Sequence, residues 1–144
     1  MIQRIQTIYL FLACILSAGL IFTFVLWENS LSEKVYALAL FQQDELTLKS
    51  IPLLYIASAI VSFCTIFLYK NRQLQFVLGR LNLLINIILL GILIYVSQTL
   101  SGEMQVSEKD IGMFIPVVVI LLVVLANKAI RKDENLVKSA DRLR

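Results

Sequence analysis

Residues 70–86, KNRQLQFVLGRLNLLIN, decide the fold, because they join two apolar runs through the tightest cationic cluster in the chain. Lys70, Arg72 and Arg80 are costly to move across a bilayer, so this turn is expected to stay on the cytoplasmic side. The apolar runs before and after it then become two antiparallel membrane helices. The sequence therefore predicts a helical hairpin around which the rest of the chain is arranged.

The composition is typical of a membrane protein. The 144 residues are 59% hydrophobic and 16% charged, whereas soluble domains are roughly 45–50% apolar and about 25% charged. The mean hydropathy is +0.84. Four apolar runs of roughly 18–20 residues are each long enough to cross a hydrocarbon layer about 30 Å thick as a helix. We predict an all-α fold, an integral membrane four-helix bundle.

The four predicted spans form one membrane domain, residues 1–127, and are followed by a tail helix. They cover about residues 8–27, 51–69, 76–97 and 111–127, and the tail covers residues 128–144. The first run is longer than the apolar region of a cleaved signal peptide, so it is predicted to be a retained anchor. Serine is a common N-cap residue and proline is tolerated in the first turn of a helix, so Ser50 and Pro52 are predicted to open the second helix.

Two features are predicted for the fourth span. Ser107 and Asp110 resemble a capping box just before it. Pro116 lies about one turn beyond its expected start, so it is predicted to bend the helix and to leave a carbonyl near Gly112 without its helical partner.

The connection between the first two spans, residues 28–50, has two open interpretations. Residues 34–41 are rich in strand formers, residues 42–45 (QQDE) suit a turn, and residues 46–50 alternate apolar and polar side chains. This pattern predicts a small extracytoplasmic β-hairpin. An amphipathic surface helix fits almost as well, so the choice between strand and helix stays open.

The distribution of Lys and Arg predicts that both termini are cytoplasmic. With that orientation the Lys/Arg residues divide ten to three in favour of the cytoplasm. The cytoplasmic ones are Arg4, Lys70, Arg72, Arg80, Lys128, Arg131, Lys132, Lys138, Arg142 and Arg144, and the external ones are Lys34, Lys49 and Lys109. The expected location is a bacterial inner membrane, as a multi-pass protein.

A polar seam is predicted between the second and third spans. Asn82 and Asn86 are four residues apart, so they share one helix face, and antiparallel packing brings Ser62 and Thr65 of the second span to a similar depth. The seam has two interpretations. It could hold the helices together through interhelical hydrogen bonds, or it could line a path for a solute. The structural interpretation is favoured.

The cytoplasmic tail is predicted to be an amphipathic helix. Three roles are open for it: a plain topological anchor, a segment lying on anionic lipid, and a docking helix for a protein partner. Its mixed charges favour protein contact over a polybasic lipid patch. The candidate docking residues are Arg131, Lys132, Asp133, Glu134, Leu136, Val137, Asp141 and Arg142.

Several function classes are disfavoured by what the chain contains. It has no histidine and only two cysteines, so neither a catalytic constellation nor a metal or cofactor site is predicted. Its basic residues flank apolar runs instead of forming a stripe with aromatics, which argues against nucleic acid. The predicted spans contain no acidic residue, which argues against a proton-coupled transporter. We expect a protein that is not an enzyme.

Three stretches resemble a known family. They are the opening MIQRIQTIYL, the central FLYKNRQLQ with GRLNLLIN, and the closing LANKAIRKDENLVKSADRLR, which is the most specific of the three. Together they resemble a bacterial, Bacteroidota-type family of small four-span inner-membrane proteins whose domain has no assigned function. The resemblance implies fold and location and leaves the mechanism open.

The sequence thus favours an integral membrane protein that acts as a non-enzymatic adaptor or scaffold and presents its cytoplasmic tail to a partner. The alternative is a small transporter or channel subunit, which would have to form a homo-oligomer and use the seam as its path. The expected partners are the lipid bilayer and a cytoplasmic protein at the tail.

Overall fold

The apolar runs fold into helices that pack around one another. The computed structural model describes residues 5–28, 34–103, 108–109 and 111–142. Within these residues the α-helices are α1 (Ile5–Phe22), α2 (Leu46–Phe67), α3 (Arg72–Glu103) and α4 (Ile115–Arg142). Helices α1 and α3 each pack against both α2 and α4, which closes a four-helix bundle. The predicted all-α bundle is confirmed.

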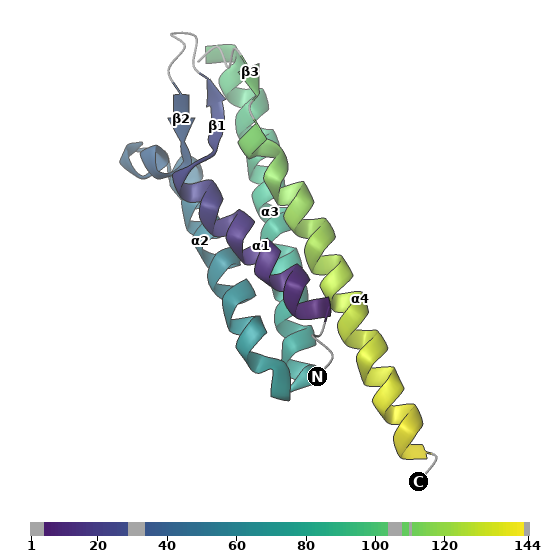
Figure 1. Ribbon diagram of the computed structural model, residues 1–144. Coiled ribbons are helices and arrows are strands. Elements are labelled where there is room, and N and C mark those ends of the chain that lie inside the picture. Colours follow the sequence, from purple (N-terminus) through teal and green to yellow (C-terminus); the bar gives the residue numbers. More distant parts are fainter. Residues whose placement is uncertain (1–4, 29–33, 104–107, 110, 143–144) are drawn as a thin grey trace.

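Successive helices run in opposite directions, so both ends of the chain lie at the same end of the bundle (Figure 1). The turn between α2 and α3 lies at that end too and contains a short 3-10 helix, Leu68–Lys70. Asn71 precedes α3, and its Oδ1 accepts a hydrogen bond from the backbone N–H of Leu74 at 3.4 Å. This side-chain cap satisfies a donor that the first turn of the helix leaves free.

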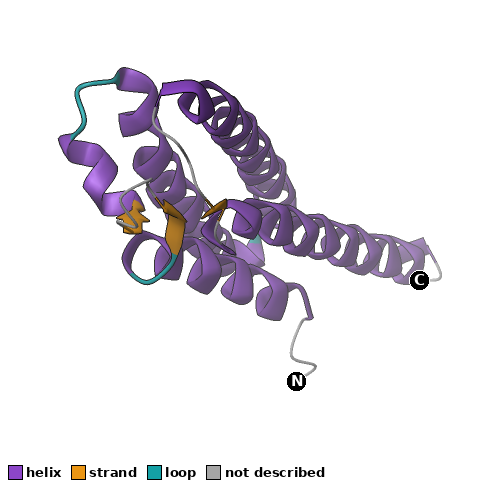
Figure 2. Cartoon of the chain, turned by 90° about the horizontal axis from the view of Figure 1, so that it is seen from above, coloured by secondary structure: helices purple, strands orange, loops and turns teal. Residues whose placement is uncertain are grey.

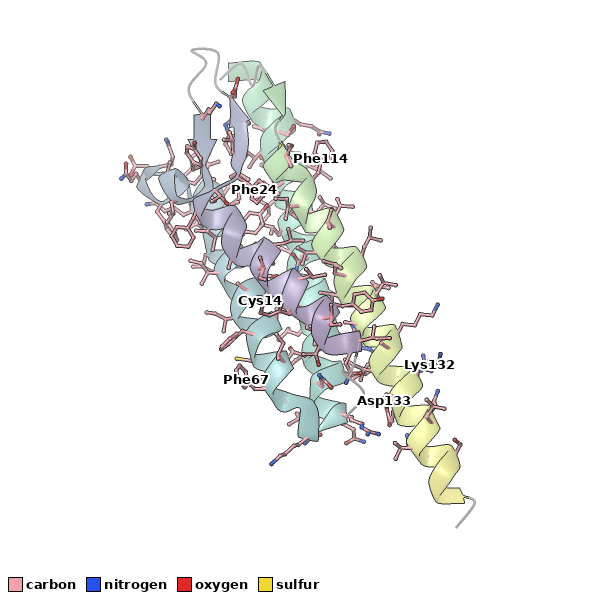
Figure 3. The ribbon with its side chains drawn as sticks, in the orientation of Figure 1. Cys14, Phe24, Phe67, Phe114, Lys132 and Asp133 are labelled. Atoms are coloured by element: carbon pink, nitrogen blue, oxygen red, sulfur yellow. The ribbon has the colours of Figure 1, made fainter. Side chains whose placement is uncertain are left out.

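The bundle is apolar outside and partly polar inside. Large apolar side chains such as Phe11, Phe63, Leu84 and Leu121 are exposed on all four helices. Phe67 and Phe114 also point outward (Figure 3). In the described part of the chain, α2, α3 and α4 are long and apolar enough to cross a membrane, while α1 is apolar but shorter. An apolar surface of this kind suits lipid as the surrounding solvent.

A small antiparallel sheet joins the two connections at the other end of the bundle (Figures 1 and 2). Its strands are β1 (Val25–Glu28), β2 (Lys34–Tyr36) and β3 (Glu108–Lys109), in the order β2-β1-β3. Trp27 in the central strand is paired with Val35 on one side and Lys109 on the other. The sheet therefore ties residues before α2 to residues before α4, a long-range contact that the sequence did not predict.

The predicted hairpin exists, but its strands differ from those expected. Only residues 34–36 of the first expected strand are extended, because the chain then turns into a 3-10 helix, Ala37–Gln42. The second expected strand, residues 46–50, is the first part of α2. The actual partner of β2 is β1, which occupies the end of the first apolar run. Helix α1 accordingly ends at Phe22, before Trp27.

Helix α2 begins earlier than the sequence indicated. Its N-cap is Glu45, so Ser50 and Pro52 lie inside the helix and the prediction that they open it is wrong. Ser50 Oγ donates to the Thr47 carbonyl at 2.6 Å instead of capping the helix. Leu48 and Ile51 are buried against the core, and this packing carries the helix past the expected boundary.

The entry into α4 is built around Pro116 and Gly112. A short 3-10 helix, Ile111–Phe114, precedes α4, and Pro116 is the second residue of α4. Proline has no N–H to donate to the Gly112 carbonyl. The hydroxyl of Tyr55 on α2 donates to that carbonyl instead, at 3.4 Å. Pro116 therefore lies in the first turn and not a turn beyond the start. The expected capping pair, Ser107 and Asp110, lies outside the described residues.

Candidate functional site

Three of the predicted seam residues, Ser62, Asn82 and Asn86, lie together at the centre of the bundle, with Asn82 in the middle. Asn82 Nδ2 donates to Ser62 Oγ at 2.6 Å, and its Oδ1 accepts from Ser58 Oγ at 2.8 Å. Residues 58 and 62 of α2 are one turn apart, as are residues 82 and 86 of α3, so each pair lies on the face turned to the other helix. Asn82, Ser58 and Ser62 are fully buried.

Asn86 and Ser17 complete the upper part of the network. Asn86 Nδ2 donates to Ser58 Oγ at 2.8 Å and to Asn82 Oδ1 at 3.0 Å. Ser58 and Ser17 hydroxyl oxygens are 3.3 Å apart. Because the one hydroxyl proton of Ser58 goes to Asn82, Ser17 must be the donor of this bond. Helix α1 is thereby joined to the α2–α3 pair.

Thr65 belongs to a lower rung of polar contacts. Its hydroxyl donates to the Val61 carbonyl of its own helix at 2.6 Å, and its backbone carbonyl accepts from Gln75 Nε2 at 3.2 Å. Gln75 Oε1 in turn accepts from Gln6 Nε2 of α1 at 3.4 Å. Thr65 therefore does not bond to either asparagine. Ser58 bonds to both of them instead, in the role that was predicted for Thr65 from its depth in the bundle.

We define the core polar ladder as the buried side chains Gln6, Ser17, Ser58, Ser62, Thr65, Gln75, Asn82 and Asn86. Four of them were not predicted as seam residues: Gln6, Ser17, Ser58 and Gln75. The signal that could have found them is the same in each case, a small or amide side chain inside or at the edge of an apolar run. Their pairing with one another depends on helix rotation, which the sequence does not give.

The chemistry of the ladder is that of neutral hydrogen bonding. It contains no ionisable acid or base, and most of its polar atoms are directed at one another. Among its members, Asn86 Oδ1 is buried without a hydrogen-bond partner. Interhelical bonds of this type contribute on average about 0.6 kcal/mol each in membranes. The arrangement therefore joins α1, α2 and α3 at defined rotations.

A close contact joins α3 to α4 near the end of the bundle where the chain starts and finishes. A Cβ added at Gly79 would overlap the side-chain amide of Asn127 and would lie 2.9 Å from its Cγ. Glycine at position 79 is thus what allows the amide to pack directly on the α3 backbone. Below this contact, Ile130 is fully buried, so α4 stays packed on the bundle for another turn.

The predicted tail is the last part of α4, which continues as a single helix to Arg142 and extends past the other helices (Figure 1). Asp133 faces the bundle, where its carboxylate lies 3.7 Å from the guanidinium of Arg72 at the start of α3 (Figure 3). Leu136 and Val137 lie farther along and are 59% and 41% exposed. The side chains of Asp141 and Arg142 lie outside the described part.

The candidate tail residues divide between two faces of α4. Successive residues in a helix are rotated by about 100°. On this spacing Asp133, Glu134 and Val137 continue the buried face of Ala126 and Ile130, and we call them the inner face. The outer face comprises Lys128, Arg131, Lys132, Asn135, Leu136 and Ser139, which line a shallow and widely open groove of about 500 Å³.

The titration of Glu134 is shifted by its neighbour on α4. Its carboxylate lies 2.7 Å from the ammonium of Lys138 one turn later. The hydrogen bond and charge of Lys138 hold the pKa of Glu134 below its usual value. The group therefore stabilises the tail helix above its ordinary pKa, and this contribution is lost as pH falls through the lowered pKa.

We expect acidification to reduce the helicity of the tail, and Glu134→Gln to remove this part of the pH dependence. Side-chain carbonyl chemical shifts of Glu134, followed by NMR through the pH range, measure the pKa directly. Lys138→Ala should return it toward the ordinary value, whereas Lys132→Ala should leave it close to wild type. Equal shifts in both variants would contradict the assignment to Lys138.

The described residues contain no group of three or more His, Cys, Asp or Glu side chains placed to hold a metal ion. The thiols do not form a pair either, since Cys64 is exposed and Cys14 Sγ donates to the Ala59 carbonyl at 3.6 Å. The described residues thus offer two candidate sites, the core polar ladder and the charged tail of α4.

Comparison with known proteins agrees with the whole-chain resemblance. Neither the curated proteins nor the solved structures include one that matches the chain. One family model, described as Domain of unknown function (DUF4293), matches residues 2–143, which is nearly the full length. The chain therefore belongs to the DUF4293 family.

Proposed function

We propose that this protein is a non-enzymatic membrane adaptor with four spans and both termini in the cytoplasm, and that the inner face of its tail binds a cytoplasmic protein. The basic residues support this orientation, since Lys70, Arg72, Lys128, Arg131 and Lys132 lie at the end of the bundle where the chain starts and finishes. A bilayer retains such residues on the cytoplasmic side.

The surface of α1 supports a fourth span. Ile8, Phe11, Leu12 and Ile15 are all 43% exposed or more, so α1 presents an apolar outer face like the longer helices. Its 18 residues correspond to about 27 Å of helix. That length is close to the hydrocarbon thickness of about 30 Å.

The observation that carries the docking proposal is the continuation of the inner face beyond the bundle. Within the bundle this face is covered, as Val123, Ala126 and Ile130 are fully buried. Asp133 and Glu134 follow on the same face, and Val137, one turn beyond them, is 41% exposed. The helix from Asn127 to Arg142 extends over about 22 Å. A helix with an apolar ridge and complementary charges is the kind of partner that fits such a face.

The ladder supports an adaptor better than a conduit. Its amides and hydroxyls donate to and accept from one another across three helices, at distances between 2.6 and 3.4 Å. A solute path needs polar groups that can exchange partners with the solute. Side chains already bonded to one another are better suited to fixing the rotation of each helix.

The test places a photocrosslinking amino acid at Val137 on the inner face and, as a matched control, at Ser139 on the outer face. The two positions are only two residues apart, so the two variants should be expressed and inserted into the membrane equally well. In native membranes we expect position 137 to crosslink one defined protein and position 139 not to crosslink it. Val137→Glu should abolish co-purification of that protein, and Ser139→Glu should preserve it.

The same crosslinks from both positions, or none from either, would overturn the docking proposal. A truncation ending at Asn135 is a useful addition, because it keeps the buried Ile130 and the contact between Asp133 and Arg72. The truncated chain should insert normally and lose the partner.

A further inference from the structure

On the outer side of α4, one continuous stripe of side chains is apolar along the span and becomes cationic after it. Val117, Leu121 and Leu125 are exposed on this face in the span, between 39% and 59%. Lys128 and Lys132 follow at the same helical spacing of three and four residues. The apolar part is the surface that would contact acyl chains. The cationic part begins where that surface ends.

The groove on the outer face combines charge with neutral donors. Its lining includes three cations, Lys128, Arg131 and Lys132, with Asn135 and Ser139 beyond them and Leu136 at the edge. No acidic side chain is among the described residues that line it. The two tail acids whose side chains the structure describes, Asp133 and Glu134, lie on the inner face. The mixed charge of the tail is therefore sorted by face, which the linear sequence does not show.

We propose that this groove binds the phosphate headgroup of an anionic phospholipid from the cytoplasmic leaflet. The phosphate would lie among Lys128, Arg131 and Lys132 and accept charge-assisted hydrogen bonds from them, which are stronger than hydrogen bonds between neutral groups. An acyl chain would extend along Leu121 and Leu125. Basic groups just cytoplasmic of a membrane helix are suited to anionic headgroups. The inference depends on the membrane placement proposed above, but it does not depend on the protein partner.

Charge complementarity is the reason to prefer a lipid to a protein on this face. A protein surface normally carries both signs, and it would leave the three clustered cations partly unpaired. A phosphate brings several acceptor oxygens to one point and can satisfy all three. The continuity with the apolar stripe adds a contact that only a molecule with an acyl chain can make.

The test compares purified full-length protein by native mass spectrometry with phosphatidylglycerol and with phosphatidylcholine. The variant Lys128→Gln/Arg131→Gln/Lys132→Gln removes the cations of the groove. The control Lys138→Gln/Arg142→Gln/Arg144→Gln removes the same charge from the end of the tail. We expect at least tenfold weaker binding of phosphatidylglycerol in the groove variant, less than threefold in the control, and no change for phosphatidylcholine.

Equal losses in the two triple variants would overturn the proposal, because attraction would then follow net charge alone. Glycerol phosphate is the second arm. If it competed as well as the intact lipid, the groove would be a soluble-phosphate site and the lipid assignment would be wrong. Accessibility mapping of position 139 decides the membrane placement separately. If position 139 is cytoplasmic but the protein does not prefer phosphatidylglycerol, the groove proposal is wrong and the orientation stands. If position 139 is external, the proposed orientation itself is wrong.

Discussion

Asn82→Ala is expected to lower the free energy of unfolding by about 2–3 kcal/mol. The substitution removes the acceptor of Ser58 and Asn86 and the donor to Ser62. Two interhelical bonds at about 0.6 kcal/mol each and one bond within α3, together with the cavity left in a fully buried site, give this magnitude. Unfolding in mixed detergent micelles, followed by circular dichroism, measures the change.

Two further variants separate the hydrogen bonds from the packing. Leu84→Ala lies on the exposed face of the same helix and should change stability by about 0.5 kcal/mol or less. Asn82→Leu keeps a similar volume but offers no polar group, so it should also be clearly destabilised. Wild-type stability in Asn82→Leu would show that the site requires only volume, which would contradict the role given to the ladder.

Gly112→Ala is expected to destabilise the protein by about 1–3 kcal/mol, because the new methyl group meets backbone atoms that cannot move cheaply. A Cβ at this position would overlap the Val25 carbonyl and would lie 2.9 Å from its carbon and 3.2 Å from Leu26 Cα. The clash lies where β1 crosses the start of the fourth helical segment. The thermal midpoint in detergent should fall accordingly.

Gly91→Ala is the matched control for that variant. A Cβ added at Gly91 meets nothing within 4 Å, and the residue lies in the interior of α3. Alanine favours the helix over glycine by up to about 1 kcal/mol, so this variant should be neutral or more stable. A loss at Gly91 as large as that at Gly112 would contradict the close contact between β1 and the entry to α4.

The seam could be anticipated because its cause is local. Two asparagines one turn apart in an apolar helix must find partners inside the bundle, and small hydroxyl residues on the preceding helix are the natural ones. The rotation and depth of α1 have no such local cause. Ser17 and Gln6 were missed for this reason, and Thr65 was assigned the position that Ser58 holds.

The ends of the elements were harder to predict than the elements themselves. Strand propensity in residues 34–41 and 46–50 is real but weak. Packing against the bundle overrides it in the second segment, which is helical. The short strand at Glu108–Lys109 could not be seen at all, because it depends on pairing with Trp27 and Glu28, far away in the chain. Long-range pairing of two residues leaves no periodic signal.

The tail illustrates a different limit. Its mixed charge argued for protein contact when the residues were taken together. The helix that continues from the span assigns each residue to a face, and only then do Lys128, Arg131 and Lys132 separate from Asp133 and Glu134. The sequence thus contains the information, but the direction of the buried face is needed to use it.

Cysteine accessibility in intact cells is the most direct test of the account, because adaptor and lipid proposals both require four spans with cytoplasmic termini. Cys14 and Cys64 are first replaced by serine or alanine. Single cysteines are then placed before Met1, at Leu38, at Asn71 and at Ser139, and are treated with a membrane-impermeant maleimide. We predict labelling of position 38 in intact cells and of the other three only after permeabilisation. Labelling of the N-terminal cysteine together with position 38 in intact cells would show that α1 does not cross, and would contradict the four-span arrangement.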